Sequence, residues 1–161
     1  MTYLVDANVL SEPTKPAPDA KVVGWLSAHE GDLVVDSIVF GEIFLGVLAL
    51  PNGRKRAQLE QWFEAVAQTI ECLPWDAAVS QRWARLVVDL KNKGRGMPVL
   101  DGMIAATALA HDLTVATRNV RDFGKAGVKM VNPFSLCLHD AESPGPKVTP
   151  SDPQLKVKAK K

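Results

Sequence analysis

Three acidic residues, Asp6, Glu42 and Asp101, each lie in a stretch of sequence that contains no other charged residue. None of them has a Lys or Arg three or four positions away, which is the spacing at which side chains on a helix pair. A carboxylate buried without a partner costs several kcal/mol unless it is protonated or bound to a metal. Divalent cations such as Mg²⁺ and Mn²⁺ take oxygen ligands, so the three acids together predict a site for one of these ions.

Two of the three acids also have a simpler interpretation. Asp6 closes a strand-like run and Asp101 follows Pro98, so either side chain could cap the N-terminus of a helix, which contributes about 1 kcal/mol. Glu42 lies in the middle of an apolar helical run, residues 38–50, beyond the first free backbone amides. Because that run is apolar on all sides of Glu42, it predicts a buried helix and a site role for its single acid.

A cluster of polar residues follows the fourth predicted strand. Asn119 and Asp122 could complete an oxygen cage around a cation, and Thr117 could orient a water or a ligand. Asn119 and Asp122 equally suit an Asx turn or a short helix cap, so both interpretations stay open. Arg118 and Arg121 would suit a phosphate group if they face the same opening, because guanidinium binds phosphate through paired N–H donors.

Other catalytic chemistries find little support. The sequence has no G-x-S-x-G serine elbow and no glycine-rich phosphate loop. Its two cysteines, Cys72 and Cys137, belong to no CxxC or Cys/His ligand pair, which disfavours a thiolate zinc site. The histidines, His29, His111 and His139, lie away from the acidic motifs and are expected at the surface or as helix caps. With no convincing general base of neutral pKa, a metal would have to activate water.

Short runs rich in Val, Ile and Leu alternate along the chain with longer helical stretches. The predicted strands are residues 3–6, 33–36, 69–73, 113–117 and 128–131, and the predicted helices are 20–29, 38–50, 54–68, 76–93 and 100–111. Asp19 and Asp76 suit N-caps, and Gly94 suits a helix end. The alternation predicts a three-layer α/β/α sandwich around a parallel sheet. Ligands of such sheets bind at the carboxyl ends of the strands, which is where Asp6 and Thr117 lie.

The properties of the whole chain limit its function. The 161 residues predict one domain over residues 1–137, followed by a flexible Pro- and Lys-rich tail over 138–161. No apolar run approaches the ~18 to 20 residues that cross a bilayer, and no cleavable leader is present, so we expect a cytoplasmic protein without membrane contact. The net charge of +1 does not by itself predict a nucleic-acid-binding protein, so a polyanion would have to meet local basic patches or bound cations.

Four motifs in this order resemble those of the PIN-domain nucleases, most closely the VapC and FitB toxins of bacterial toxin–antitoxin pairs. They are Leu4-Val5-Asp6-Ala7-Asn8-Val9-Leu10-Ser11-Glu12, Glu42 ahead of Leu45-Gly46, Asp101-Gly102-Met103-Ile104-Ala105-Ala106-Thr107-Ala108, and Thr117-Arg118-Asn119 through Asp122-Phe123. The resemblance covers residues 1 to about 134, and one departure is Ala7, where Thr is common. It implies a five-stranded parallel sheet of order 3-2-1-4-5, in which Asp6 and Thr117 are neighbours.

The resemblance also implies roles for individual residues. The metal-binding acids of the family correspond to Asp6, Glu42 and Asp101, and the segment from Asn119 to Asp122 supplies the fourth position. Asn119 stands where some members have Asp, which makes Asp122 the better candidate for the fourth acid. The residues expected to contact or orient the substrate are Asn8, Thr117, Arg118 and Asn119.

For function, the resemblance implies an Mg²⁺- or Mn²⁺-dependent endoribonuclease that acts as the toxin of a toxin–antitoxin pair. Asp6 and Asp101 would hold the ion, while Glu42 and Asp122 would bind a second ion or direct the attacking water. A cognate DNA-binding antitoxin would cover the site, so this chain would meet DNA only indirectly, and a homodimer is expected. The RNA that is cleaved cannot be read from the sequence, because unpaired bases are recognised by shape and stacking.

Two other functions stay open at this level. A signalling receiver domain also groups acids and Mg²⁺ at one end of a parallel sheet, but it would need an acceptor Asp at the end of the third strand and a Lys after the fifth. The sequence has Leu73-Pro74-Trp75 and Asn132-Pro133 at those places. A PIN module without catalytic activity, which only binds RNA or a partner protein, would carry the same motifs.

Overall fold

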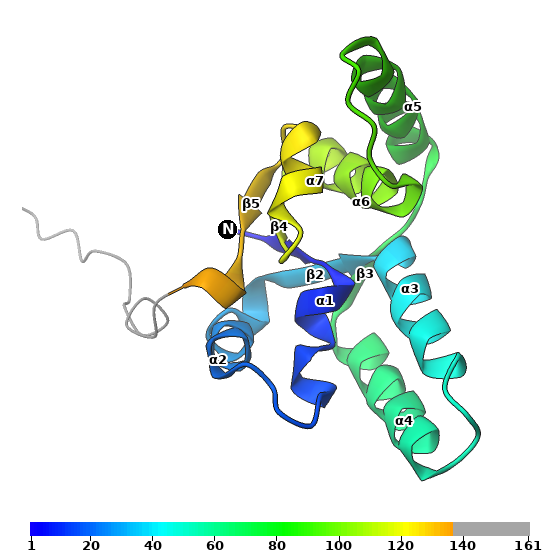
Figure 1. Ribbon diagram of the computed structural model, residues 1–161, viewed down its shortest axis with the longest axis vertical. Coiled ribbons are helices and arrows are strands. Elements are labelled where there is room, and N and C mark those ends of the chain that lie inside the picture. Colours follow the sequence, from blue (N-terminus) through cyan, green and yellow to red (C-terminus); the bar gives the residue numbers. More distant parts are fainter. Residues whose placement is uncertain (137–161) are drawn as a thin grey trace, which may run out of the picture.

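Five parallel strands form the sheet of the protein, for which the computed structural model describes residues 1–136 (Figure 1). The strands are β1 (Tyr3–Val5), β2 (Leu33–Asp36), β3 (Glu71–Leu73), β4 (Thr114–Ala116) and β5 (Lys129–Val131). Their order is β3-β2-β1-β4-β5, and every neighbouring pair is parallel. The predicted order is therefore confirmed, and each predicted strand lies within two residues of its expected bounds.

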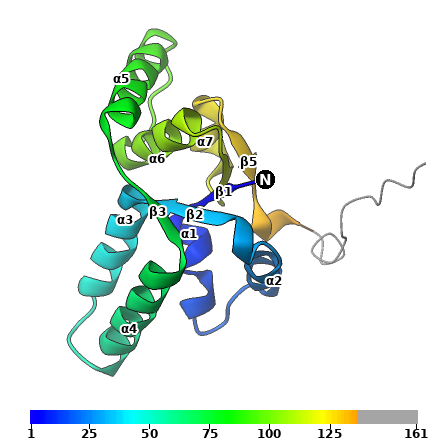
Figure 2. The ribbon, with the colours of Figure 1, turned by 180° about the vertical axis from the view of Figure 1, so that it is seen from behind.

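Helices cover both sides of this sheet (Figures 1 and 2). They are α1 (Ala7–Leu10), α2 (Ala20–Ala28), α3 (Ser37–Leu48), α4 (Arg54–Thr69), α5 (Ala77–Asn92), α6 (Val99–Ala110) and α7 (Val120–Lys125), with short 3₁₀ turns η1 (Glu12–Thr14), η2 (Glu30–Asp32) and η3 (Pro133–Ser135). Helices α6 and α7 lie on one side of the sheet, and α1, α2 and α4 lie on the other. The predicted α/β/α sandwich is confirmed.

Aspartates fix where α2, α3 and α5 begin, because each accepts a hydrogen bond from a free amide of the first turn. Asp19 and Asp76 each accept from a backbone N–H two or three residues further along the chain, as predicted for both. Asp36 caps α3 in the same way, through the N–H of Val39. Gly94 follows the end of α5 with a φ of 64°, a left-handed conformation that glycine adopts without strain.

The hydrophobic core lies between the central strands and α6. Leu4 of β1, Val115 of β4 and Ile104 of α6 are each 0% exposed. The same face of α6 is rich in buried alanines, whose small side chains let the helix approach the sheet closely. Because β1 and β4 pair directly, this core holds their carboxyl ends side by side, where Asp6 and Thr117 follow.

The prediction that the helix around Glu42 is buried on all sides is wrong. Val39 and Ile43 form part of an inward stripe of α3, but Leu45 and Leu48 on the outer face are 68% and 40% exposed. The physical reason is that the contacts of α3 with α1, α4, α6 and β2 leave Leu45 and Leu48 uncovered by any described segment. Glu42 lies at the boundary between these faces and is half-buried.

The remaining predictions concern the histidines, the tail and membrane-spanning helices. His29 and His111 end α2 and α6 as C-cap residues, which confirms their expected placement. The predicted tail over 138–161, which includes His139, lies outside the described residues. No helix within residues 1–136 is long and apolar enough to span a membrane.

Replacing Leu4 with Ala should lower the free energy of unfolding by roughly 2–5 kcal/mol, because Leu4 is 0% exposed and the change leaves a cavity beneath the site. Leu45→Ala is the matched control, since Leu45 is 68% exposed, and it should change stability by no more than about 0.5 kcal/mol. Urea denaturation followed by circular dichroism measures both values. Equal effects of the two substitutions would contradict the described core.

Candidate metal centre

Asp6 lies just after β1, and its carboxylate accepts three hydrogen bonds. Oδ1 accepts from the backbone N–H of Ala7 at 2.8 Å, so Asp6 does cap α1. Oδ2 accepts from the hydroxyl of Thr117 at 2.6 Å and from the side-chain amide of Asn8 at 2.9 Å. Asp6 is only 5% exposed, and this burial raises its pKa although the hydrogen bonds act to lower it.

The side-chain amide of Asn119 joins two further acids. Its Nδ2 donates to Oδ2 of Asp101 at 3.0 Å and to Oδ2 of Asp122 at 3.1 Å. Its backbone N–H donates to the Thr117 hydroxyl at 2.9 Å, which connects this group to Asp6. Asn119 does not cap α7 with its side chain, and Asp101 lies in the first turn of α6 rather than at the cap position. The cap interpretation therefore fails for the Asn119 and Asp101 side chains.

Glu42 approaches the same acids from α3. Burial raises its pKa to about 7, and repulsion from Asp6, Asp101 and Asp36 adds to the shift. The pKa of Asp101 is also raised, first by burial and then by Asp6 and Asp122. Four acids from different elements thus lie close enough to repel one another. The expectation that no group titrates near neutral pH is wrong for Glu42, because both the burial that raises its pKa and the acids that add to the rise depend on the fold.

Asp36 is a member of this acidic group that the sequence analysis missed. It is 1% exposed at the end of β2, next to β1 in the sheet, and burial raises its pKa. The signal was present, because Val5-Asp6 and Val35-Asp36 both place an Asp directly after the valine that ends a buried run. Adjacent parallel strands that end in the same residue type bring those residues together at one edge of the sheet.

Asp122 differs from the other acids because a cation already partners it. Nζ of Lys125 lies 2.9 Å from its Oδ1, and this contact, with the Asn119 hydrogen bond, lowers the pKa of Asp122. Asp122 is half-exposed at the first turn of α7. It therefore lies at the edge of the group, with part of its charge neutralised.

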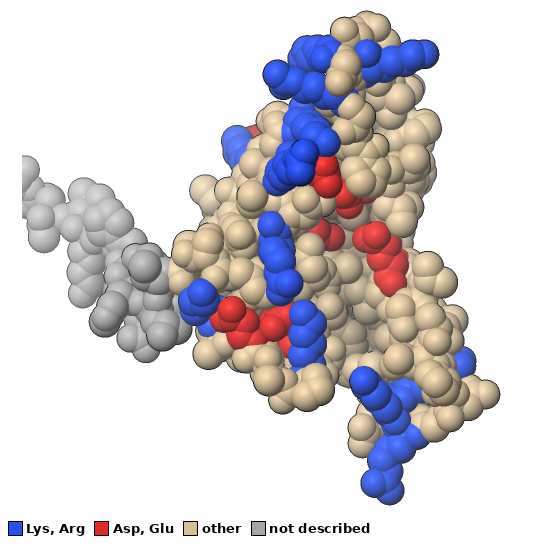
Figure 3. Space-filling model, in the orientation of Figure 1, with Lys and Arg blue, Asp and Glu red and all other residues tan. Residues whose placement is uncertain are grey.

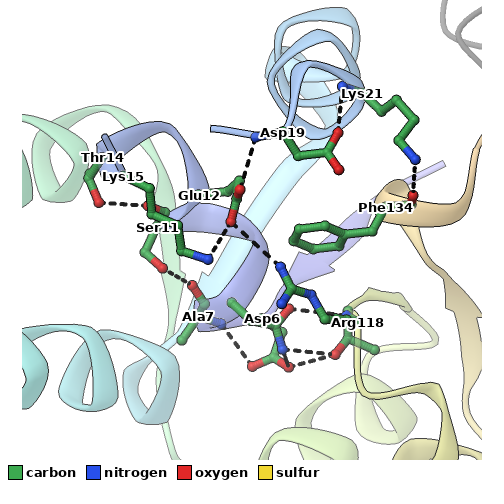
Figure 4. Close-up of polar contacts among 12 residues, drawn as sticks. Asp6, Ala7, Ser11, Glu12, Thr14, Lys15, Asp19, Lys21, Arg118 and Phe134 are labelled. Atoms are coloured by element: carbon green, nitrogen blue, oxygen red, sulfur yellow. Dashed lines mark hydrogen bonds and ion pairs between the residues drawn. The ribbon is translucent and has the colours of Figure 1, made fainter. Parts of the chain in front are cut away.

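Glu12 is a second acid that the sequence analysis did not select, and it lies beside the group rather than in it (Figure 4). Its Oε2 is 2.6 Å from Nζ of Lys15 and 3.7 Å from a guanidinium nitrogen of Arg118. The contact with Lys15 is the main cause that lowers the pKa of Glu12. The spacing of Glu12 and Lys15 is visible in the sequence, but the approach of Arg118 depends on the fold.

The donors present fit a hard divalent cation. Asp6, Glu42 and Asp101 offer only carboxylate oxygens, and none of the ion pairs in the described part of the chain engages them. Their raised pKa values report a cost of holding negative charge, which Mg²⁺ or Mn²⁺ would remove. As the side chains stand within residues 1–136, no group of three or more Asp, Glu, His or Cys residues is arranged to hold a metal ion, so Asp6, Glu42 and Asp101 would have to draw closer around a bound cation.

A hollow opens beside these acids. A pocket of about 300 Å³ is lined by Asn8 of α1 and Glu42 of α3, and its far wall includes Leu59 and Trp62 of α4. Figure 3 shows acidic side chains gathered in the central hollow of this face, with Lys and Arg side chains along its rim. A polyanion that entered the hollow would meet both the cation-binding oxygens and the basic rim.

Comparison with known proteins identifies the family. The family model described as "PIN domain" matches residues 3–129. The chain is 38% identical over 135 residues to "Toxin FitB" of Neisseria gonorrhoeae, an alignment that covers 81% of this chain and 97% of the relative. This chain belongs to the PIN-domain family, in its VapC/FitB branch. It is also 35% identical over 135 residues to "VapC ribonuclease Y4jK" of Sinorhizobium fredii, over 81% of this chain and 96% of that protein.

Solved structures agree with this assignment of the PIN domain. The structure of FitAB bound to an IR36 DNA fragment matches with a TM-score of 0.80 and 37% identity, over 86% of this chain and 99% of that one. The crystal structure of FitAcB from Neisseria gonorrhoeae matches with a TM-score of 0.77 and 38% identity, over 84% and 100% of the two chains. The resemblance found in the four motifs is therefore confirmed.

We expect Glu42→Gln to stabilise the metal-free protein near pH 8 and to have little effect near pH 5. The pKa of Glu42 rises from 4.5 to about 7 on folding, so wild-type stability falls as the pH rises through this window. Gln mimics the protonated acid that the folded protein already holds at the lower pH. Thermal unfolding in EDTA measures the difference. The control, Glu64→Gln on the exposed side of α4, should be neutral at both pH values, and a pH-independent effect of Glu42→Gln would contradict the raised pKa.

Proposed function

We propose that this PIN domain is a divalent-metal-dependent endoribonuclease that hydrolyses RNA phosphodiesters. The observation that carries the proposal is the group formed by Asp6, Glu42 and Asp101, in which burial raises each pKa and neighbouring acids raise those of Glu42 and Asp101 further. Acids perturbed in this way at the carboxyl ends of parallel strands are typical of functional sites. The similarity to a relative named a VapC ribonuclease supports the same activity.

In this proposal Asp6 and Asp101 hold Mg²⁺ or Mn²⁺, and Asp122 lies beside them as a fourth carboxylate whose charge Lys125 partly neutralises. A bound ion supplies charge neutralisation and makes a water more acidic, which favours attack on phosphorus. Glu42 binds a second ion or directs the attacking water. Its position suits this task because it borders the pocket and is half-exposed, so that solvent reaches its carboxylate.

Neutral side chains hold the acids in place and face the substrate. Asn8 and Thr117 both donate to Oδ2 of Asp6, which fixes the orientation of that carboxylate. Asn119 does the same for Asp101. Arg118 follows Thr117 at the rim, where its side chain is 53% exposed and open to a phosphate of the RNA.

The alternatives differ in how far the structure supports them. A CheY-type receiver domain is excluded because such domains have the strand order 2-1-3-4-5, whereas this sheet has the order 3-2-1-4-5. A catalytically silent PIN module would show the same fold. Asp6, Glu42 and Asp101 have raised pKa values and no ion-pair partner among the described residues. Such acids lower the stability of the folded protein, and a module that only binds RNA or protein would not need them, which favours a catalytic function.

We further propose that the chain acts in the cytoplasm as the toxin of a toxin–antitoxin pair. The named relative "Toxin FitB" and the structure of FitAB on a DNA fragment support a cognate antitoxin as partner. In this arrangement the antitoxin contacts operator DNA, and the PIN domain meets DNA only through it. Leu45 and Leu48 of α3, three and six residues beyond Glu42, are exposed apolar side chains that a partner could cover.

The first test is cleavage of a panel of structured RNAs in Mn²⁺ or Mg²⁺, followed on denaturing gels. Asp6→Ala and Asp101→Asn should each reduce cleavage on the order of 100-fold or more, and EDTA should abolish it. Asp89→Asn, at an exposed position of α5, is the charge-matched control and should cleave normally. Cleavage that survives Asp6→Ala would refute the role proposed for the acids.

A homodimer is the last part of the proposal. Val87 and Val88 of α5 and Val99 of α6 are 43%, 56% and 67% exposed near a cavity of about 410 Å³ between these helices. Sedimentation at micromolar concentration should show a dimer, and Val88→Asp should shift it toward monomer. Val23→Asp on the opposite side of the sheet, at a residue 37% exposed, should not. A wild-type protein that sediments only as monomer would contradict the dimer.

A further inference from the structure

We propose that Arg118 and Lys15 form a binding subsite for an RNA phosphate next to the acidic group, and that Glu12 and Phe134 are positioning residues that set the Arg118 guanidinium. This inference rests on the proposed ribonuclease function and names how its substrate is held. The residues concerned come from η1 and the residue after it, the segment after β4, and η3, which the fold brings together beside Asp6 (Figure 4).

The backbone of Arg118 is linked to the acidic group through the side chain of Asn8. Its N–H donates to Oδ1 of Asn8 at 3.1 Å, and the amide of the same Asn8 side chain donates to Oδ2 of Asp6 at 2.9 Å. A single Asn side chain thus bridges the Arg118 backbone and a proposed metal ligand. A phosphate bound by Arg118 would therefore lie next to the acids rather than on a remote surface.

The guanidinium of Arg118 is oriented but its hydrogen-bond donors are free. Its central carbon lies 3.8 Å from the centroid of the Phe134 ring, which fixes the plane of the group by cation–π stacking. Its nearest acid, Glu12, is 3.7 Å away, too long for a hydrogen bond. No residue within 1–136 accepts a side-chain hydrogen bond from Arg118. An oriented guanidinium with free N–H donors is suited to a bidentate phosphate contact.

Glu12 is built to hold positive charge at this place. It is 4% exposed, and its Oε1 accepts from the backbone N–H of Asp19 at 2.9 Å. Because the contact with Lys15 lowers its pKa, the carboxylate stays negative at neutral pH and attracts both Lys15 and Arg118. The Lys15 side chain is still 47% exposed, so it can contact a ligand while paired.

Phe134 is itself fixed from two sides. Its backbone N–H donates to Oδ1 of Asn132 at 3.1 Å, and its carbonyl accepts from Nζ of Lys21 on α2. These contacts hold η3 against the start of α2, so that the ring lies beneath the guanidinium (Figure 4). The stacking contact therefore belongs to the folded framework and is in place before RNA binds.

The subsite would offset the repulsion between RNA and the acidic group. The acidic group repels RNA, and the net charge of the chain is only +1, so the chain as a whole does not attract a polyanion. Basic groups held beside the acids supply local attraction, as the rim in Figure 3 shows. Each phosphate contacted on a single strand should add about 0.7 to the salt dependence of binding.

The test measures binding of a fluorescein-labelled single-stranded RNA by anisotropy, in Ca²⁺ in place of Mg²⁺, with gels to verify that the RNA stays intact. Arg118→Ala should weaken binding roughly tenfold and reduce the slope of log K against log salt by about 0.7. Lys129→Ala, which removes an equal charge at the amino end of β5, level with the start of β4 rather than with the strand end that Arg118 follows, should bind like wild type. Arg118→Ala that binds like Lys129→Ala would overturn the subsite.

Two further variants test positioning separately from charge. Glu12→Gln makes the protein more positive, so simple electrostatics predicts tighter RNA binding, whereas loss of positioning predicts binding a few-fold weaker. Phe134→Leu changes no charge and should also weaken binding a few-fold, which keeps the test valid if Glu12→Gln fails to fold. Thermal unfolding identifies the folded variants. Tighter binding by a folded Glu12→Gln, or unchanged binding by Phe134→Leu, would refute the positioning role.

These outcomes separate the inference from the proposed function. If wild type cleaves RNA but Arg118→Ala binds it normally, the subsite is wrong and the ribonuclease proposal stands. If Arg118→Ala loses binding while wild type shows no cleavage that depends on Asp6, the subsite is supported and the catalytic proposal is refuted.

Discussion

Repulsion between carboxylates that cannot move apart is the constraint on which the site depends. Parallel strands β1 and β2 end side by side, so Asp6 and Asp36 must be neighbours, while α3 and α6 bring Glu42 and Asp101 to the same edge. Two charges about 5 Å apart repel by roughly 3 kcal/mol at an effective dielectric near 20, and one hydrogen bond returns only about 1 kcal/mol. The Thr117 hydroxyl therefore offsets part of the cost, and a cation that bound here would also stabilise the fold.

The protein treats its buried acids in two opposite ways. Glu12 receives Lys15 and a backbone N–H, so its pKa falls and its charge is satisfied internally. Glu42 receives no cation and faces other acids, so its pKa rises to about 7. Both lie on helical segments a short distance from Asp6. Glu12 thus holds the cationic side chains of its neighbours, whereas Glu42 has no cationic side chain beside it and stays available to a cation from solution.

Local patterns predicted the five strands, the five longer helices and the isolated acids, because burial and helix periodicity are recorded in neighbouring residues. They did not predict α1 and α7, which are too short to show a helical period. They did not predict that Asp36 joins Asp6, although the repeated Val-Asp at two strand ends carries that information. The half-exposure of Glu42 was misjudged because an apolar helix at the edge of a sheet looks the same in sequence as a buried one. The approach of Arg118 to Glu12 joins residues 106 positions apart and has no local signal.

The placement of η3 bears on where this domain ends. The family pattern stops at residue 129, yet Phe134 lies beneath Arg118 and its carbonyl is held by α2. A truncation after residue 129 would keep all the acids of the site but would remove most of β5 and the Phe134 ring on which the Arg118 guanidinium stacks. A fragment that keeps the stacking contact of Arg118 must therefore extend through Phe134, whereas a shorter one already contains all the acids. Comparing the two fragments would separate the contribution of the acids from that of the oriented guanidinium.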